Sequence, residues 1–153
     1  MDYNKKVTSI NNTITLKKDN LYIAKSELCE KGVFSSKAIM KGEIIECCPV
    51  IVFPHTDIEF LQYTNLYNYY SFKQKEGFPA VLALGFGSIY NHSSPSNAQY
   101  ELNLDEKTVT ITSVCSIAAN TEITINYNGH FNDDKPVVFV EKNEMYEFSI
   151  NLL

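Results

Sequence analysis

Residues 84–97 read LGFGSIYNHSSPSN, and the rest of the fold can be argued outward from this stretch. An apolar run with two glycines stops abruptly at the polar pair Asn91-His92. Glycines in such a run suit a strand or a tight turn with close backbone approach, and a buried Asn or His must find hydrogen-bond partners. An isolated pair of this kind is more often a satisfied part of the core than a ligand site. No nearby His, Asp or Glu has the spacing of a metal site.

The segments on either side predict short β-strands. Period-2 alternation and β-branched residues place strands at residues 44–53, 98–104, 108–114 and 122–127, and residues 21–24 form a short apolar run. Asp105-Glu-Lys107 separates two of these strands and predicts a hairpin, in which Tyr100 and Leu102 share one face. One short helix is expected over residues 57–66, beginning at Thr56 or Asp57.

Composition indicates one folded domain and excludes one class of function. Of 153 residues, 44% are hydrophobic and 12% aromatic, which suits a single buried core. Thirteen lysines and no arginine stand against 18 acids, so the net charge is −5. A protein that binds DNA or RNA through phosphates needs a basic footprint, and no arginine fork is present. We therefore expect no direct nucleic-acid binding.

The charge is divided unevenly along the chain. Residues 1–76 carry 10 lysines and 9 acids, whereas residues 77–153 carry 3 lysines and 9 acids. A charged macromolecule that binds the second half should therefore be basic. A solvated acidic face without a partner is the plainer alternative.

Cysteine usage and the first residues predict a reduced, intracellular, cytoplasmic protein. Cys29, Cys47, Cys48 and Cys115 form no C-x-x-C pair, so neither a disulfide framework nor a zinc site is expected. The adjacent pair lies in a strand-like run and should consist of small buried hydrophobes. Residues 1–12 hold no apolar signal segment, and no run approaches the length of a membrane span.

Three motifs follow one another along the chain. They read KGVFSSKAIMKGE at residues 31–43, LALGFGSIYNHSSPSN at residues 82–97 and EITINYNG at residues 122–129. Together and in this order they resemble the SET domain, the protein-lysine methyltransferase fold that uses S-adenosylmethionine. The similarity is closest to compact bacterial and viral SET proteins without zinc-binding flanks.

The resemblance implies a mainly β fold of several small sheets with short helices. It also implies a knot-like C-terminal crossing, in which the segment with Asn91-His92 passes the final strand. The SET domain is expected over residues 21–132, with an N-terminal flank at residues 1–20. A C-terminal flank at residues 133–153 should pack on the domain or on a partner subunit.

The resemblance also implies the residues of a cofactor site. Lys31, Gly32 and Phe34 should line it, mostly through their backbone. Asn91 and His92 should hold the methionine and adenine ends of S-adenosyl-L-methionine. Taken alone, Gly32 has a plainer interpretation, because one glycine before two apolar residues is most often a simple turn.

Tyr127 matches the family's catalytic tyrosine, which also borders the cofactor, although a strand-end tyrosine taken alone is more often part of the core. Tyr70, Tyr100 and Phe131 are expected to line the lysine channel. Methyl transfer to an amine is an in-line displacement, so alignment supplies much of the acceleration. A dry channel and a neighbouring sulfonium lower the pKa of the lysine, so no strong protein base is required.

The motifs depart from the family pattern at three places. Glu30 stands where the first glycine of Gly-x-Gly is usual, and Pro95 comes one position early. After Tyr127 only Phe131 is available to close the channel. The remaining wall must therefore come from residues 129–153 or from a second subunit, so a homodimer is one of two solutions.

The predicted function is protein-lysine N-methylation of a basic, lysine-containing protein. A histone is the expected substrate if the protein acts in the nucleus of a host, and a bacterial protein is equally open. The alternative is a catalytically silent SET-like module that binds a peptide or cofactor, because a fold alone does not determine activity.

Overall fold

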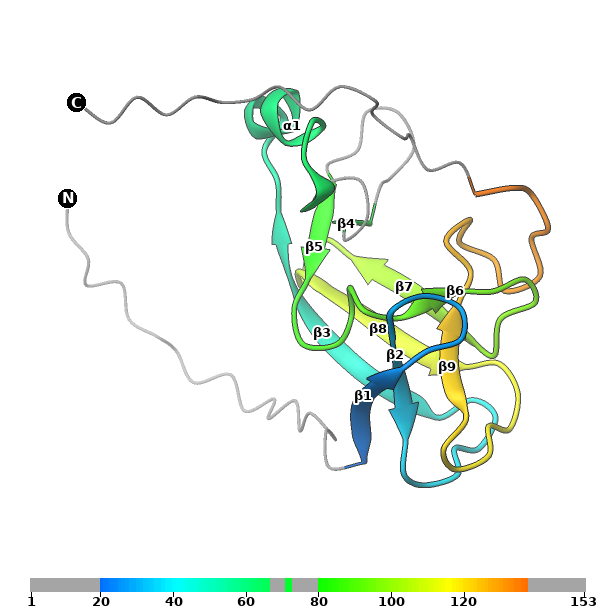
Figure 1. Cartoon of the computed structure of the whole chain (residues 1–153). Helices are drawn as coiled ribbons and strands as arrows, with labels where there is room; N and C mark the ends of the chain where they lie inside the picture. The colour runs from blue at the N-terminus through cyan, green and yellow to red at the C-terminus, as the bar shows by residue number, and fades with distance from the viewer. Residues whose placement is uncertain (1–19, 67–70, 73–79, 138–153) are drawn as a thin grey trace, which may run out of the picture.

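The computed structural model describes residues 20–66, 71–72 and 80–137, and its strands form two sheets (Figure 1). The four-stranded sheet has the order β1 (Leu21–Lys25), β2 (Lys31–Ser35), β9 (Glu122–Ile125) and β6 (Asn91–His92). The five-stranded sheet has the order β4 (Ser71–Phe72), β5 (Val81–Ala83), β3 (Ile44–Val52), β8 (Thr108–Ser113) and β7 (Ala98–Asn103). The predicted mainly β architecture is confirmed.

The predicted hairpin is β7 and β8. Its register pairs Tyr100 with Ile111 and Leu102 with Val109, so the two apolar faces meet as the alternation predicted. Strand β8 also pairs with β3, which lies at the centre of the five-stranded sheet. Buried residues from both sheets, among them Val33, Ile111 and Ile123, form one core.

The crossing expected near the end of the domain is made by β9 and the segment that follows β6. Strand β9 pairs antiparallel with β2 on one side and parallel with β6 on the other. The Asn97 amide then bonds β9 twice: it donates to the Glu122 carbonyl (2.8 Å) and accepts from the Thr124 N–H (2.9 Å). The Asn97 side chain thus makes the two hydrogen bonds to the β9 backbone that a neighbouring strand would otherwise make.

The run over residues 80–90 combines a strand and a turn. After β5 the chain turns at Gly85, whose φ of +69° suits glycine. At Gly87 a Cβ atom would come within 2.6 Å of Ala83 and 2.9 Å of the Cys48 sulfur, so the predicted close approach is present. Cys48 is fully buried, as predicted, whereas Cys47 is half-buried, and both are free thiols.

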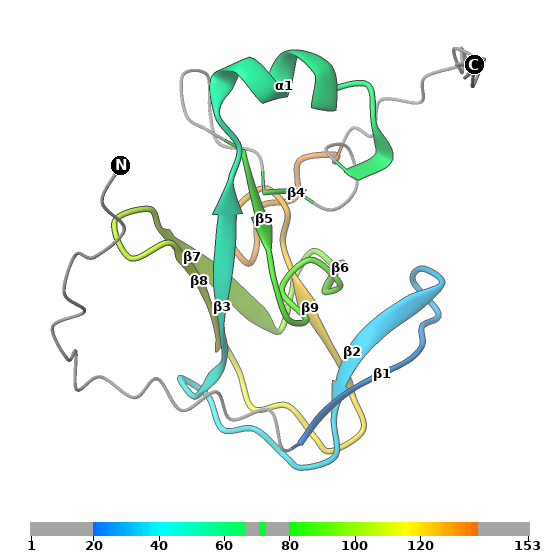
Figure 2. The same cartoon turned by 90° about the vertical axis from the view of Figure 1, so that its left-hand side faces the viewer.

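The helix begins earlier and ends earlier than predicted. Helix α1 spans His55–Leu61, with Pro54 as its N-cap. The prediction placed the start at Thr56 or Asp57 because these are side-chain caps, but no side-chain cap bond forms here. Figures 1 and 2 place α1 at the end of the molecule away from β1 and β2. Within the described residues, no helix has both the length and the apolar character needed to cross a membrane.

Candidate functional site

The Asn91 side chain is held by three groups from the β1–β2 region and β9. Its Nδ2 donates to Glu122 Oε1 (2.7 Å), to the Lys31 carbonyl (2.9 Å) and to Ser26 Oγ (3.2 Å). These contacts arise because β6 lies beside β9, with Asn91 opposite Thr124. Asn91 Nδ2 therefore has its hydrogen-bond partners within the protein, as expected for a polar residue that is part of the core.

Gly32 lies inside β2 and not in a turn, and the space beside it is already taken. A Cβ atom on Gly32 would overlap Glu122 Oε1 and come within 2.6 Å of Glu122 Cδ. The missing side chain thus makes room for the Glu122 carboxyl group. Phe34 pairs with Glu122 across the two strands, so both project from the same face of the sheet. Its ring stacks on Tyr22, with ring centroids 5.7 Å apart.

His92 lies against the backbone and the ring of Tyr127. The Tyr127 N–H donates to His92 Nδ1 (3.1 Å), and the ring centroids are 5.3 Å apart. Burial lowers the pKa of His92 below its ordinary value of 6.5. The imidazole is therefore neutral at pH 7, and the accepting Nδ1 leaves the ring proton on Nε2.

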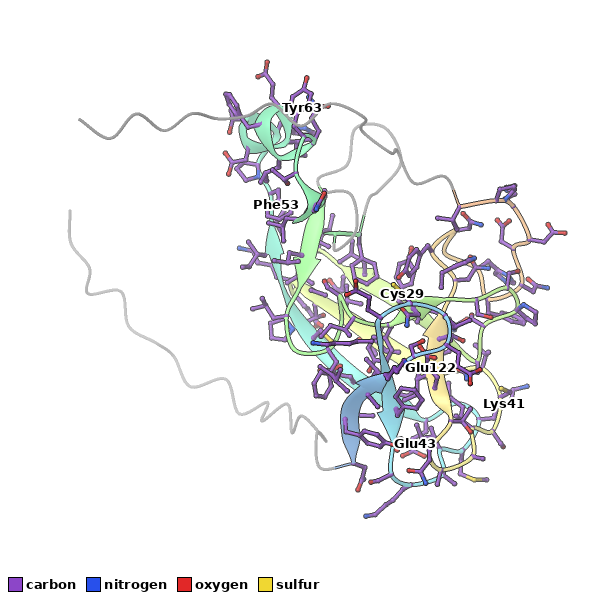
Figure 3. The ribbon with its side chains drawn as sticks, viewed as in Figure 1. Cys29, Lys41, Glu43, Phe53, Tyr63 and Glu122 are labelled. Atoms are coloured by element: carbon purple, nitrogen blue, oxygen red, sulfur yellow. The ribbon has the colours of Figure 1, made fainter. Side chains whose placement is uncertain are left out.

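Tyr127 presents a hydroxyl that stays protonated. It donates to the Tyr90 carbonyl oxygen (2.9 Å). Burial raises the pKa of Tyr127 to about 12, with further contributions from Cys29 and Glu122. In Figure 3, Glu122 lies on β9 next to the loop that carries Cys29. Glu122 bonds Asn91, and the ring of the next residue, His92, lies against Tyr127, so these residues adjoin one another.

Tyr100 and Phe131, two of the residues expected in the lysine channel, contact different aromatic rings. The Tyr100 ring lies edge-on against Phe72, with centroids 4.8 Å apart, and burial raises the pKa of its hydroxyl. A Cβ atom on Gly129 would lie 3.8 Å from that hydroxyl, which brings Tyr100 to the turn after Tyr127.

Phe131 is tied to the next turn. Its carbonyl accepts from the Ser96 N–H (2.9 Å), and its ring lies against His130, with centroids 4.9 Å apart. Among the ring contacts of the described residues, none pairs Phe131 with Tyr100. Tyr70 lies outside the described residues.

Sequence reasoning missed two residues of the Asn91 cluster, Ser26 and Glu122. Glu122 alternates with the buried Ile123 along β9, and this alternation names no partner for its side chain. The one available signal was a glycine in β2, whose space Glu122 fills, but no local pattern shows that β2 and β9 are neighbours. Among the described residues, no group of three or more His, Cys, Asp or Glu could hold a metal ion.

Comparisons with known proteins agree on the family. A family model described as SET domain matches residues 30–128. A histone-lysine N-methyltransferase of Schizosaccharomyces pombe, specific for H3 lysine-37, is 32% identical over 111 residues, which span 72% of this chain and 74% of that protein.

Solved structures show the same similarity. A Plasmodium falciparum protein studied as a candidate histone methyltransferase superposes with a TM-score of 0.58 and 36% identity, over 71% of this chain and 92% of that chain. A chain of the ctPRC2 complex gives a TM-score of 0.56 at 19% identity, over 70% of this chain and 14% of that chain, and it supports the fold alone. The resemblance inferred from the three motifs is confirmed. The chain belongs to the SET-domain family and is a protein-lysine methyltransferase.

Proposed function

We propose that this protein transfers a methyl group from S-adenosyl-L-methionine to a lysine side chain in a basic segment of another protein, with Tyr127 as the catalytic residue. The observation that carries the proposal is the protonated Tyr127 hydroxyl, which is held on the Tyr90 carbonyl beside His92 and within electrostatic reach of Glu122. This arrangement joins the residues of the second and third sequence motifs in one place.

The residues present fit the proposed cofactor. S-adenosylmethionine supplies the activated methyl group, and its amino-acid end carries an ammonium that needs hydrogen-bond acceptors. Asn91 would hold that end, since its carbonyl oxygen receives no hydrogen bond from a described residue. The neutral His92 and the backbone around Lys31 and Gly32 would border the rest, and Phe34 lies on the same sheet face as Glu122.

Tyr127 would orient the reacting amine without acting as a base. With a pKa of about 12, its hydroxyl is a hydrogen-bond donor throughout the neutral range. Because that hydrogen is donated to the Tyr90 carbonyl, the hydroxyl oxygen would accept an N–H of the amine and leave its lone pair free to attack the methyl group. Such a contact fixes geometry, which is the main requirement of an in-line displacement. Tyr100, Phe131 and Tyr70 would border the aliphatic part of the lysine, and tyrosine rings also stabilise cationic methylamines.

The proposed substrate is a lysine-rich protein tail, of which a histone tail is the first candidate. The support comes from two relatives described as histone methyltransferases, one with an assigned lysine on histone H3. It also comes from the charge of residues 77–153, which carry 3 lysines and 9 acids and hold most of the proposed site. An acidic surface attracts basic tails and raises their association rate.

Incubation of the purified chain with radiolabelled cofactor and with histones or other lysine-rich proteins tests the proposal. The wild-type protein is expected to label at least one of them. Tyr127→Phe should lower the rate at least about 100-fold, because the ring remains and only the orienting hydroxyl is lost.

Calorimetry supplies the matched measurement. Tyr127→Phe should bind the cofactor within about twofold of the wild-type affinity, since its backbone bond to His92 is kept. Full activity of Tyr127→Phe would overturn the catalytic assignment. A wild-type chain that binds no cofactor would overturn the proposed function and favour the silent module.

A further inference from the structure

We propose that Glu122 is a positioning residue that fixes the orientation of the Asn91 amide, so that its carbonyl oxygen is offered to an ammonium group of the bound ligand. The inference rests on the proposed function, because the ligand considered is the amino-acid end of S-adenosylmethionine or of its product. Ser26 holds Glu122 in place.

The orientation of the Asn91 amide is decided by the groups around it. One end faces two acceptors, Glu122 Oε1 at 2.7 Å and the Lys31 carbonyl at 2.9 Å. An amide oxygen placed there would oppose a carboxyl oxygen and a carbonyl oxygen, so this end must be the NH₂ group. Because Glu122 makes the shorter contact, its loss removes the strongest constraint on the amide.

The opposite end of the amide is left for a ligand. No described residue donates to Asn91 Oδ1, and the described residues include no buried side-chain oxygen or nitrogen without a partner. The oxygen is therefore at the part of Asn91 that remains open, which is 8% exposed overall. A fixed carbonyl oxygen next to a carboxyl group is suited to an ammonium and not to a carboxylate.

Glu122 is itself held by a buried hydroxyl and by the shape of β2. The Ser26 hydroxyl lies 2.8 Å from Glu122 Oε2 and 3.0 Å from Oε1. Ser26 in turn accepts from the Leu28 N–H (2.9 Å), so the β1–β2 loop fixes its position. The carboxyl group fills the space where Gly32 lacks a side chain. The network therefore has one arrangement before any ligand arrives, which is what preorganisation requires.

The test compares two ligands by calorimetry on the full chain. S-adenosylhomocysteine carries the α-amino group, and its deaminated analogue lacks only that group. In Glu122→Ala, affinity for S-adenosylhomocysteine should fall about tenfold, whereas affinity for the deaminated analogue should change less than about twofold. Glu122→Gln keeps an acceptor oxygen and should retain most of the preference for the amino ligand.

Glu106→Ala is the matched control, because it removes an exposed carboxylate from the β7–β8 turn, and it should leave both affinities unchanged. If Glu122→Ala does not fold, Ser26→Ala is measured instead. The ratio of its affinities for S-adenosylhomocysteine and the deaminated analogue should be about threefold smaller than that of the wild type. Equal loss for both ligands, or loss for neither, would overturn the positioning role. A wild-type chain that binds neither ligand would instead overturn the proposed function.

Discussion

Tyr90 connects the core to Tyr127, the proposed catalytic residue, through its two ends. Its hydroxyl donates to the buried Glu46 carboxyl group (3.1 Å), which also accepts from the Phe86 N–H (3.2 Å). Its carbonyl oxygen accepts from the Tyr127 hydroxyl. Burial raises the pKa of Tyr90, so its hydroxyl is a permanent donor. The side chain and backbone of one residue thus link β3 to Tyr127.

Tyr90→Phe should lower the free energy of unfolding by about 1–3 kcal/mol, because it removes a donor from a buried carboxyl group. Urea unfolding followed by circular dichroism measures the change. Tyr22→Phe is the matched control, since its hydroxyl bonds Asn120 at the surface (2.9 Å), and it should cost less than about 0.5 kcal/mol. Equal losses in the two variants would contradict a structural role for the Glu46 bond.

His92 should make stability depend on pH. Its folded pKa lies below 6.5, so the unfolded state binds more protons as the pH falls through 6.5. The contribution of His92 to stability is therefore fully present above pH 6.5 and is lost on acidification, and protonation of Nδ1 also removes the acceptor of the Tyr127 N–H. Between pH 7.5 and 5.5, wild type should lose more unfolding free energy than His92→Gln. Equal losses would show that His92 is not responsible.

At the level of single residues, the sequence predicted which motif residues belong to the site, but not which side chains they contact. The site built around Asn91, His92 and Tyr127 could be proposed because these residues lie in recognisable motifs. Ser26 and Glu122 could not, since their contacts depend on which strands are neighbours. For Gly32 the turn interpretation was wrong, since it lies in β2 and makes room for the Glu122 carboxyl group, whereas its place beside the cofactor stays a prediction.

Among the elements, β9 is the one that joins all parts of the site. It pairs with β2 and β6, accepts a hydrogen bond from Asn97 Nδ2 and donates one to Asn97 Oδ1. Its inward residues Ile123 and Ile125 are almost completely buried. The position of Tyr127 therefore depends on how firmly β9 is held.

Asn97→Ala should lower the free energy of unfolding by about 2–4 kcal/mol, because two backbone groups of β9 lose their partners. Denaturant unfolding measures this loss. Asn103→Ala is the control: its side chain accepts from the Glu106 N–H (3.0 Å) at the exposed hairpin, and it should cost less than about 1 kcal/mol. A small effect of Asn97→Ala would mean that strand pairing alone holds β9.

Sequence patterns predicted the longer strands because alternation and turn residues agree there. The β7–β8 hairpin has the expected register, since one face of each strand must be buried. The two-residue strand β6 was not predicted, because two residues have no period and β6 exists only through its pairing with β9. The start of α1 was wrong because Pro54 begins the helix without a side-chain cap.

At the scale of the whole molecule, the acidic half of the chain is also the half that carries most of the proposed site. Residues 77–153 carry 3 lysines and 9 acids, and Asn91, His92 and Tyr127 belong to this half. The Asp133 carbonyl accepts from Asn126 Nδ2 (2.6 Å) and Ser94 Oγ (2.9 Å). The backbone of Asp133 is thus held beside the end of β9, and its side chain pairs with Lys135 Nζ (3.3 Å).

Salt should therefore weaken methylation of a lysine-rich peptide. Raising the salt from about 25 to 250 mM should lower kcat/KM about tenfold, because screening removes long-range attraction, while cofactor affinity changes little.

Asp134→Asn should lower the low-salt kcat/KM about twofold. Glu106→Gln removes the same charge from the β7–β8 turn, which lies apart from residues 130–137 in Figures 1 and 2, and should leave kcat/KM nearly unchanged. Initial rates with one peptide at several salt concentrations provide the comparison. If both variants kept the wild-type salt dependence, the acidic half would be a solvated face with no part in substrate capture.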